Sequence, residues 1–165
     1  MKKLFVIATM VMGLAGVSKA QLNANAGAEI QANLLKGLTM TVSGSVGFGN
    51  VAITSGTVNS TSEATFTVTG TAGANIQITN MPTTVTLGDS SSGANGSITF
   101  SPTLTASTTT TPTSTDANTS TSYQLQGSFP GSGNYYFTLS GSITLTGNEA
   151  AGLYKGTYTL TVAYQ

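Results

Sequence analysis

Apolar and polar residues alternate along much of the chain, which is typical of β-strands with one buried face. Phe66 and Val68 alternate with threonines, and Ile76 and Ile78 alternate with polar residues. The same spacing recurs at Val85 and Leu87, at Ile98, Phe100 and Leu104, at Tyr123 and Leu125, from Phe137 to Leu145, and from Tyr158 to Tyr164. Pro102 interrupts one of these segments, and proline favours a strand edge or a bulge.

Clusters of Gly, Asn and Ser separate the alternating segments, and no segment shows a convincing amphipathic helix. The pattern therefore predicts an all-β fold, a two-layer antiparallel sandwich of the immunoglobulin-like or pilin-like kind. The expected core comprises Phe66, Val68, Ile76, Ile78, Phe100, Phe137, Leu139, Ile143, Leu145, Leu160 and Val162.

The Thr- and Ser-rich segment Thr105–Ser122 is expected to be a mobile surface loop outside this core. A binding tip or a glycosylation platform is the alternative.

The first twenty residues have the pattern of a secretory signal peptide. Lys2 and Lys3 precede an apolar run from Leu4 to Val17, and Ser18-Lys19-Ala20 offers small residues for cleavage before Gln21. A membrane anchor is the alternative, but the run is short for a bilayer span, which needs about 20 residues. We therefore expect export to the periplasm, the extracellular space or the cell surface, and no stable membrane span.

Residues 21–35 form the longest alternating stretch and are treated as an N-terminal arm, followed by a sandwich domain over residues 36–165. Its apolar positions are Leu22, Ala24, Ala26, Ala28, Ile30, Ala32 and Leu34. Extended, residues 21–34 would span about 46 Å, longer than most strands. The arm is either the first strand of its own domain or a donor strand that completes the sheet of a neighbouring molecule. A one-residue slip would replace the apolar face by Asn and Gln.

The composition argues against catalysis, because the chain has no Cys and no His, and only 6% of its residues are charged. Thiol nucleophiles, Ser-His-Asp triads and the usual zinc sites are thereby excluded. Asp89 and Asp116 each offer a single carboxylate to their loops, too few for calcium. We expect no catalytic residue, no metal and no cofactor. Gly44–Gly49 lacks the lysine of a phosphate loop and is expected to be a strand with bulges.

The charge that remains beyond Ala20 is weakly acidic. Lys36 and Lys155 stand against five Asp and Glu residues, a net charge of about −3. Nucleic-acid binding is driven by basic surface, so no nucleic-acid partner is expected.

Several segments resemble the bacterial secreted family called domain of unknown function 4402 (DUF4402). The resemblance is carried by Leu38–Met40, Val46–Val51, Ala64–Gly70, Gly73–Ile78 and Gly152–Tyr164. It extends over nearly the whole chain after the signal peptide. Because the family has no settled activity, the resemblance implies a fold and a location rather than a function.

The C-terminus also resembles the subunits of chaperone–usher pili, which end in an alternating strand. Such subunits tend to have a penultimate aromatic residue and a glycine fourteenth from the end, the positions of Tyr164 and Gly152 here. Tyr158, Leu160 and Val162 fill the alternating positions between them. The chain lacks the disulfide that such subunits often carry.

These observations lead to the hypothesis of a non-enzymatic structural subunit of a fimbria or other surface fibre. Assembly would proceed by donor-strand complementation, so the expected partner is a second copy of the chain, and a periplasmic chaperone is a further candidate partner. Ile30 and Leu34 would be the strongest anchors of the arm. The alternative from another class is a monomeric secreted adhesive or carbohydrate-binding sandwich.

Overall fold

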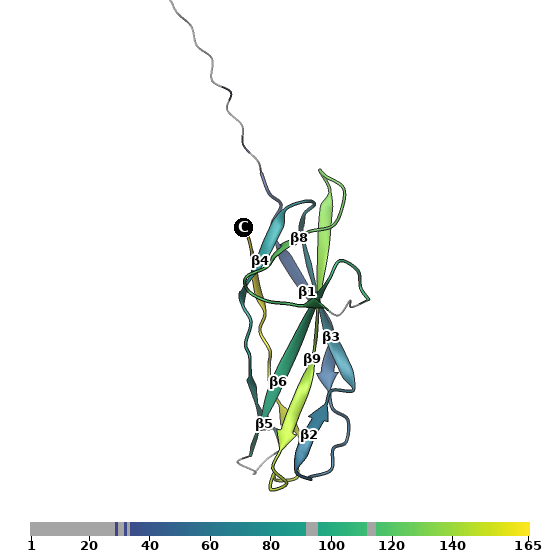
Figure 1. Ribbon diagram of the computed structural model, residues 1–165, viewed down its shortest axis with the longest axis vertical. Helices are drawn as coiled ribbons and strands as arrows, with labels where there is room; N and C mark the ends of the chain where they lie inside the picture. Colours follow the sequence, from purple (N-terminus) through teal and green to yellow (C-terminus); the bar gives the residue numbers. More distant parts are fainter. Residues whose placement is uncertain (1–28, 30–31, 33, 92–95, 112–114) are drawn as a thin grey trace, which may run out of the picture. The chain divides into compact units, whose positions relative to one another are not determined.

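The computed structural model describes residues 29, 32, 34–91, 96–111 and 115–165. Leu34–Gln165 forms one compact unit. In the described part of Leu34–Gln165, strands joined by turns and loops account for all regular structure. The prediction of an all-β, antiparallel two-sheet fold is confirmed (Figure 1).

The larger sheet has eight strands. Its main path follows, in spatial order, β1 (Thr39–Gly47), β3 (Ser62–Thr71), β9 (Ser132–Leu145), β6 (Ser97–Ser107), β5 (Val85–Asp89) and β10 (Tyr154–Lys155). Two short strands lie off this path, β2 (Gly56–Asn59) against β9 and β7 (Thr115–Asp116) against β6. All these pairs are antiparallel.

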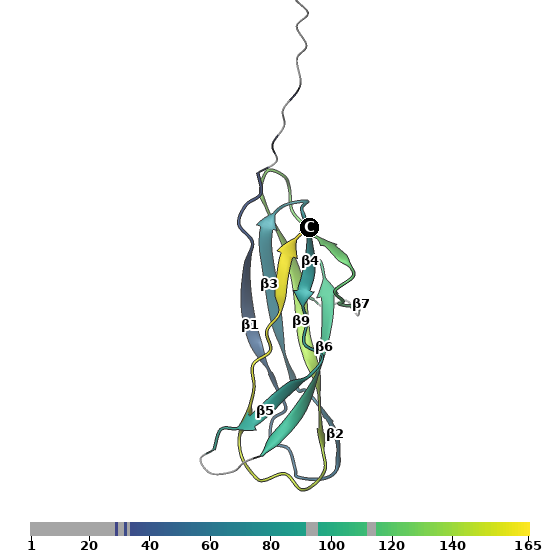
Figure 2. The same cartoon turned by 90° about the vertical axis from the view of Figure 1, so that its left-hand side faces the viewer.

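The smaller sheet has three strands, with β4 (Asn75–Asn80) between β11 (Thr161–Tyr164) and β8 (Ser122–Gln124). Figure 2 shows the yellow β11 beside β4, with β1 along another edge of the unit. The two sheets therefore leave β1 and β11 as the terminal strands of their respective ladders.

The main core lies between the two sheets. Its least exposed large side chains are Phe137, Ile76, Ile78, Leu125 and Val68. The Phe137 ring packs edge-on against Tyr123 at 5.1 Å between ring centroids, a favourable arrangement of aromatic rings. Every predicted core residue is buried except Val162, which is half-buried and packs against the same cluster.

Pro102 lies within β6, where the sheet has a local edge. β5 pairs with β6 only over Ser97–Phe100, and β7 pairs with it only at Thr105 and Ala106. On its other side Pro102 faces Gly141 of β9, where a Cβ would lie 2.3 Å from the Ser101 carbonyl oxygen. The missing N–H of the proline therefore falls in the gap between β5 and β7, in agreement with the predicted edge.

The prediction that Thr105–Ser122 lies outside the core is wrong for both ends of the segment. Ala106 and Ala117 are buried, at 3% and 7% exposure, and belong to the main core. Ala106 continues the alternation of Leu104 along β6, and the Ala117 N–H donates to the Leu104 carbonyl at 2.8 Å. Two alanines among many threonines are thus enough to attach the segment to the sheet.

The C-terminal alternation also forms less strand than its pattern predicts. Only Thr161–Tyr164 is β11, because β4 ends at Asn80, opposite Thr161. Beyond that point the Asn80 side chain donates to the Thr159 carbonyl at 3.4 Å in place of a backbone ladder. Leu160 is buried nonetheless. The residues before β11 therefore pack with their side chains but leave much of their backbone outside the ladder.

Candidate functional site

The smaller sheet covers only part of the larger one, and an apolar groove opens where this cover ends. A second cluster, Ile98, Phe100, Ile143 and Leu145, lies toward the last residues of β9. Its neighbours are not strands of the smaller sheet but partly buried residues around Val46, Phe48 and Tyr154. The groove has a volume of about 960 Å³. The side chains of flanking segments, and not the smaller sheet, cover this half of the sandwich.

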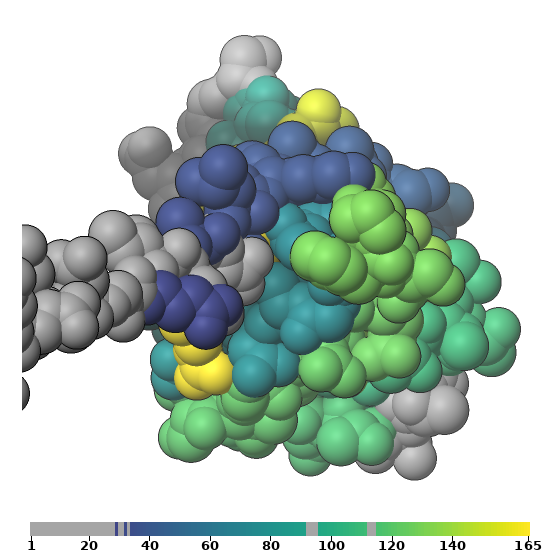
Figure 3. All heavy atoms as spheres, turned by 90° about the horizontal axis from the view of Figure 1, so that it is seen from above, coloured from purple at the N-terminus to yellow at the C-terminus, as the bar shows by residue number. Residues whose placement is uncertain are grey.

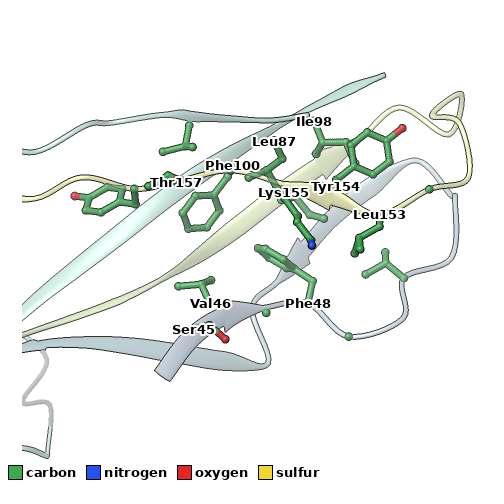
Figure 4. A pocket seen from close by; sticks show the side chains of 18 of the residues that line it. Ser45, Val46, Phe48, Leu87, Ile98, Phe100, Leu153, Tyr154, Lys155 and Thr157 are labelled. Carbon is green, nitrogen blue, oxygen red and sulfur yellow. The ribbon is translucent and has the colours of Figure 1, made fainter. Parts of the chain in front are cut away.

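The groove has two walls and an apolar floor. Residues 42–51 of β1 and the loop after it form one wall, and residues 149–158 form the other. The floor comes from the larger sheet, with Phe66, Ile98, Phe100, Leu139, Ile143 and Leu145. Figure 4 shows Phe48 and Phe100 facing the groove from opposite sides, with the Lys155 side chain extending between them and Leu153. The surroundings are those of a site for apolar side chains.

Glycines shape the β1 wall. The β1–β3 ladder shifts register between Gly44 and Gly47, which confirms the predicted bulge. Gly44 has φ of 79°, and a Cβ there would lie 2.6 Å from the Glu63 carbonyl oxygen. Only glycine fits this close approach in a left-handed conformation. The bulge therefore lets the last residues of β1 leave the plane of the larger sheet and stand as a wall of the groove.

The β1 wall of the groove has an unpaired strand edge. In the described part of the chain, β1 pairs only with β3. The other wall contains β10, which pairs with β5, and residues 156–158, which belong to no strand. Exposed edges present unused N–H and C=O groups and are normally shortened, charged or covered. Val42 on the β1 edge is instead apolar and 58% exposed.

Tyr164 joins the end of β11 to the residues that precede β1, beyond the residues that line the groove. Its hydroxyl accepts a hydrogen bond from the Thr71 N–H at 2.8 Å and donates one to the Lys36 carbonyl at 2.9 Å. Leu38 packs against the main core beside this contact. Because Lys36 is where the predicted arm joins the domain, we call this the arm end.

The opposite end is open and apolar, and we call it the mouth. Ile53 and Leu153 line the groove there and are 43% and 57% exposed. Glu149 fastens the adjoining loop, since its carboxylate accepts from the N–H groups of Thr146 and Gly147 at 2.6 and 3.0 Å. The hydrogen bond from the Thr146 N–H is the main reason that the pKa of Glu149 falls to about 2.

Tyr158 brings one polar atom into the apolar wall. Its hydroxyl is buried and, among the described residues, has no hydrogen-bond partner. Burial raises the pKa of Tyr158 above its ordinary value. The hydroxyl therefore stays protonated at neutral pH and can donate a hydrogen bond to an acceptor that enters the groove.

The predicted C-terminal site residues line this groove or belong to the main core beside it. Tyr158 lines it, Leu160 is buried in the main core, and Val162 and Tyr164 pack against that core. Gly152 lines the mouth, where a Cβ would lie 2.8 Å from the Asp89 carboxylate. The resemblance to a pilus-subunit terminus pointed to these positions, and the structure gives Gly152 a local steric reason.

The predicted arm residues are mostly outside the structural description. Leu22, Ala24, Ala26, Ala28 and Ile30 lie among the residues that the structure does not describe. Ala32 and Leu34 are described and exposed, Leu34 at 89%. Leu34 is therefore not a core residue of the compact unit.

The residues of the β1 wall were missed as a site. Val42, Val46 and Phe48 line the groove, and their spacing of two to four residues was a usable signal. The glycines between these residues interrupt the alternation of apolar and polar side chains and obscure this signal. Ile53 and Leu153 lie in loops, where no periodicity marks them.

The residues that the structure describes contain no cluster of three His, Cys, Asp or Glu side chains able to hold a metal ion. Nor does that part of the chain contain a helix long and apolar enough to cross a membrane.

A protein-family model matches most of the chain. No curated protein matches the chain. The profile of the domain of unknown function (DUF4402) matches residues 27–164, nearly the whole compact unit. The chain therefore belongs to the DUF4402 family.

Proposed function

We propose that this protein is a non-enzymatic subunit of a bacterial fimbria or surface fibre, assembled by donor-strand complementation. The observation that carries the proposal is an apolar groove of about 960 Å³ with the unpaired edge of β1 along one wall. An inserted strand would satisfy this edge with its backbone and fill the groove with one face of its side chains. The protein would be secreted and displayed at the cell surface, as its predicted signal peptide suggests.

The arm of a second copy has the length and pattern of the missing strand. At about 3.3 Å per residue, residues 22–34 extend over roughly 43 Å, and the β1 edge with its continuation from Thr39 to Gly49 over roughly 36 Å. All even positions of the arm are apolar, so one face can enter the groove while Asn, Gln and Glu stay outside.

The direction of insertion is taken as antiparallel to β11, because every ladder of the described part of the unit is antiparallel. β11 runs toward the arm end, where Tyr164 contacts Lys36. A donor strand antiparallel to β11 would enter with Leu34 at the mouth, and Ile30 would then lie farther inside the groove. The alanines at positions 24 and 26 would lie toward the arm end.

An arm folded back into its own groove would have the reverse polarity. It would run antiparallel to β1, with Leu34 at the arm end beside Tyr164 and Leu22 at the mouth. Leu34 would then be covered, whereas it is 89% exposed in the compact unit. The exposure of Leu34 therefore favours an arm from another subunit.

Two arm variants of the chain beginning at Gln21 test the proposal. Ile30→Asp places a charge on the face that enters the groove and is expected to abolish polymers, because burying an unpaired charge is costly. Asn25→Asp adds the same charge to the other face and is expected to assemble. Size-exclusion chromatography with light scattering measures both. Equal assembly of the two variants, or a monomeric parent chain, contradicts the proposal, and a monomer would instead favour a solitary adhesive module.

A further inference from the structure

The compact unit exposes large apolar side chains at both of its ends. Phe129, in the connection between β8 and β9 at the arm end, is 72% exposed. Ile53 and Leu153 are exposed at the mouth. β9 begins at Ser132, near Phe129, and ends at Leu145, which pairs with Gly56 close to Ile53. Its fourteen residues separate the two sites by roughly 45 Å, so they cannot meet within one molecule.

The loop that carries Phe129 is held in place by hydrogen bonds. The Gly131 N–H donates to the Ser128 carbonyl at 2.7 Å and closes a tight turn around Phe129. Below it, Gln126 and Asn134 exchange two backbone hydrogen bonds of 2.9 Å. The ring nevertheless belongs to neither apolar cluster. A loop with a backbone that is already held in place loses little conformational entropy when a partner covers it, so this loop is suited to docking.

The root of the arm is joined to the same loop. The Lys36 ammonium group donates to the Ser132 hydroxyl at 3.2 Å, and the neighbouring Leu35 is 44% exposed. Figure 3 looks onto this end, where the light green surface of the β8–β9 connection stands close to the dark blue surface of the residues that precede β1. A molecule that receives the arm through its mouth therefore comes close to Phe129 as well.

We propose that Phe129 of one subunit packs against Ile53 and Leu153 at the mouth of the next. The partner is a second copy of this chain, and the inference rests on the proposed strand donation with Leu34 at the mouth. Two apolar sites that cannot meet within one molecule would then be covered by a single repeated contact. This contact between domain bodies would add to the inserted arm and limit rotation of one subunit about the other.

Cysteine cross-linking tests the contact, because the chain has no cysteine of its own. The chain from Gln21 carrying Phe129→Cys and Leu153→Cys is polymerised, oxidised and analysed on a denaturing, non-reducing gel. The matched control carries Phe129→Cys and Thr103→Cys, since Thr103 is exposed in the middle of β6, away from the mouth. Disulfides need Cα atoms within about 7 Å, so only a true neighbour is linked.

The expected result is a ladder of covalent oligomers from the Phe129→Cys/Leu153→Cys polymer and loss of that ladder in the control. A polymer without a ladder, or with equal ladders in both variants, overturns the end contact and leaves strand donation standing. A chain that forms no polymer, even without cysteines, contradicts strand donation and this inference together. The assembled state of the parent chain thus distinguishes the two failures.

Discussion

Two phenylalanine-to-alanine substitutions should differ in cost if the sandwich is closed at one end and open at the other. Phe137 is fully buried between the two sheets, against Tyr123 and Tyr135. Phe100 is also buried, at 4% exposure, but it forms part of the floor of the groove. Both substitutions remove the same atoms, and they differ in the space that those atoms leave behind.

The expected magnitudes follow from that difference. Phe137→Ala creates an enclosed cavity, and such changes lower the free energy of unfolding by about 3–5 kcal/mol. Phe100→Ala leaves a space that adjoins the groove, so the transfer contribution dominates, at about 1.5–3 kcal/mol. The aromatic contacts act in the same direction, since Phe137 packs against two rings and Phe100 against one, that of Phe48. We expect Phe137→Ala to be the more destabilising by about 1–2 kcal/mol.

Urea denaturation followed by tyrosine fluorescence measures both variants, in the Ile30→Asp background so that no donor arm fills the groove. The slope of the unfolding free energy against urea concentration should be the same for both variants, so their urea midpoints can be compared directly. Equal losses for the two variants would mean that the Phe100 site is as closed as the Phe137 site. That result would refute the description of the groove as a half of the sandwich that the smaller sheet does not cover.

Three further substitutions test particular contacts. Tyr164→Phe removes two hydrogen bonds at the arm end and should lower the unfolding free energy by about 1–3 kcal/mol in denaturant titrations, whereas Tyr154→Phe, which removes one exposed hydrogen bond to the Ala150 carbonyl, should lower it less. Glu149→Gln should lower the melting temperature at neutral pH. Because the pKa of Glu149 is depressed from 4.5 to about 2, this stabilisation is complete above pH 4.5 and is lost as the pH falls through about 2, so melting curves of variant and parent should converge there. Ala117→Asp should destabilise strongly by burying a charge, and Thr110→Asp, exposed in the same segment, should melt like the parent.

The strands and the main core could be predicted because they depend on local alternation. Phe66 and Val68, or Ile76 and Ile78, lie on one face at a spacing of two residues, and that spacing alone decides which side of a sheet they occupy. The same argument placed Phe137 and Leu145 on the inner face of β9. Their burial follows from the pattern without knowledge of which strands pair.

The groove could not be predicted in this way because it depends on long-range pairing. The pattern from Tyr158 to Tyr164 does not reveal that β4 ends at Asn80, which limits the ladder with β11. Likewise, the glycines at 44 and 47 suggested a bulge, but only the pairing of β1 with β3 shows that it turns Val46 and Phe48 into a wall. Whether a surface stays uncovered depends on which strands do not pair with one another. The alternation of residues within one strand does not contain that information.

The Thr- and Ser-rich segment shows the opposite error, in which composition concealed structure. Threonine is well suited to half-buried strand positions, so a run of threonines is compatible with β6 as far as Ser107. The two alanines that enter the core, Ala106 and Ala117, are the only apolar residues in the segment and would have been the better guide.

Binding of the arm as a free peptide tests the central claim most directly. A synthetic peptide of residues 21–34 is titrated into the Ile30→Asp chain, whose own arm is expected to be unable to occupy a groove. We predict binding at one peptide per chain and, at a hundredfold excess over the dissociation constant, a gain in stability of about 2.7 kcal/mol in the melting curve. The same peptide with Ile30→Asp should neither bind nor stabilise. An unchanged melting temperature with the parent peptide at millimolar concentration would contradict the proposal that the groove receives this strand.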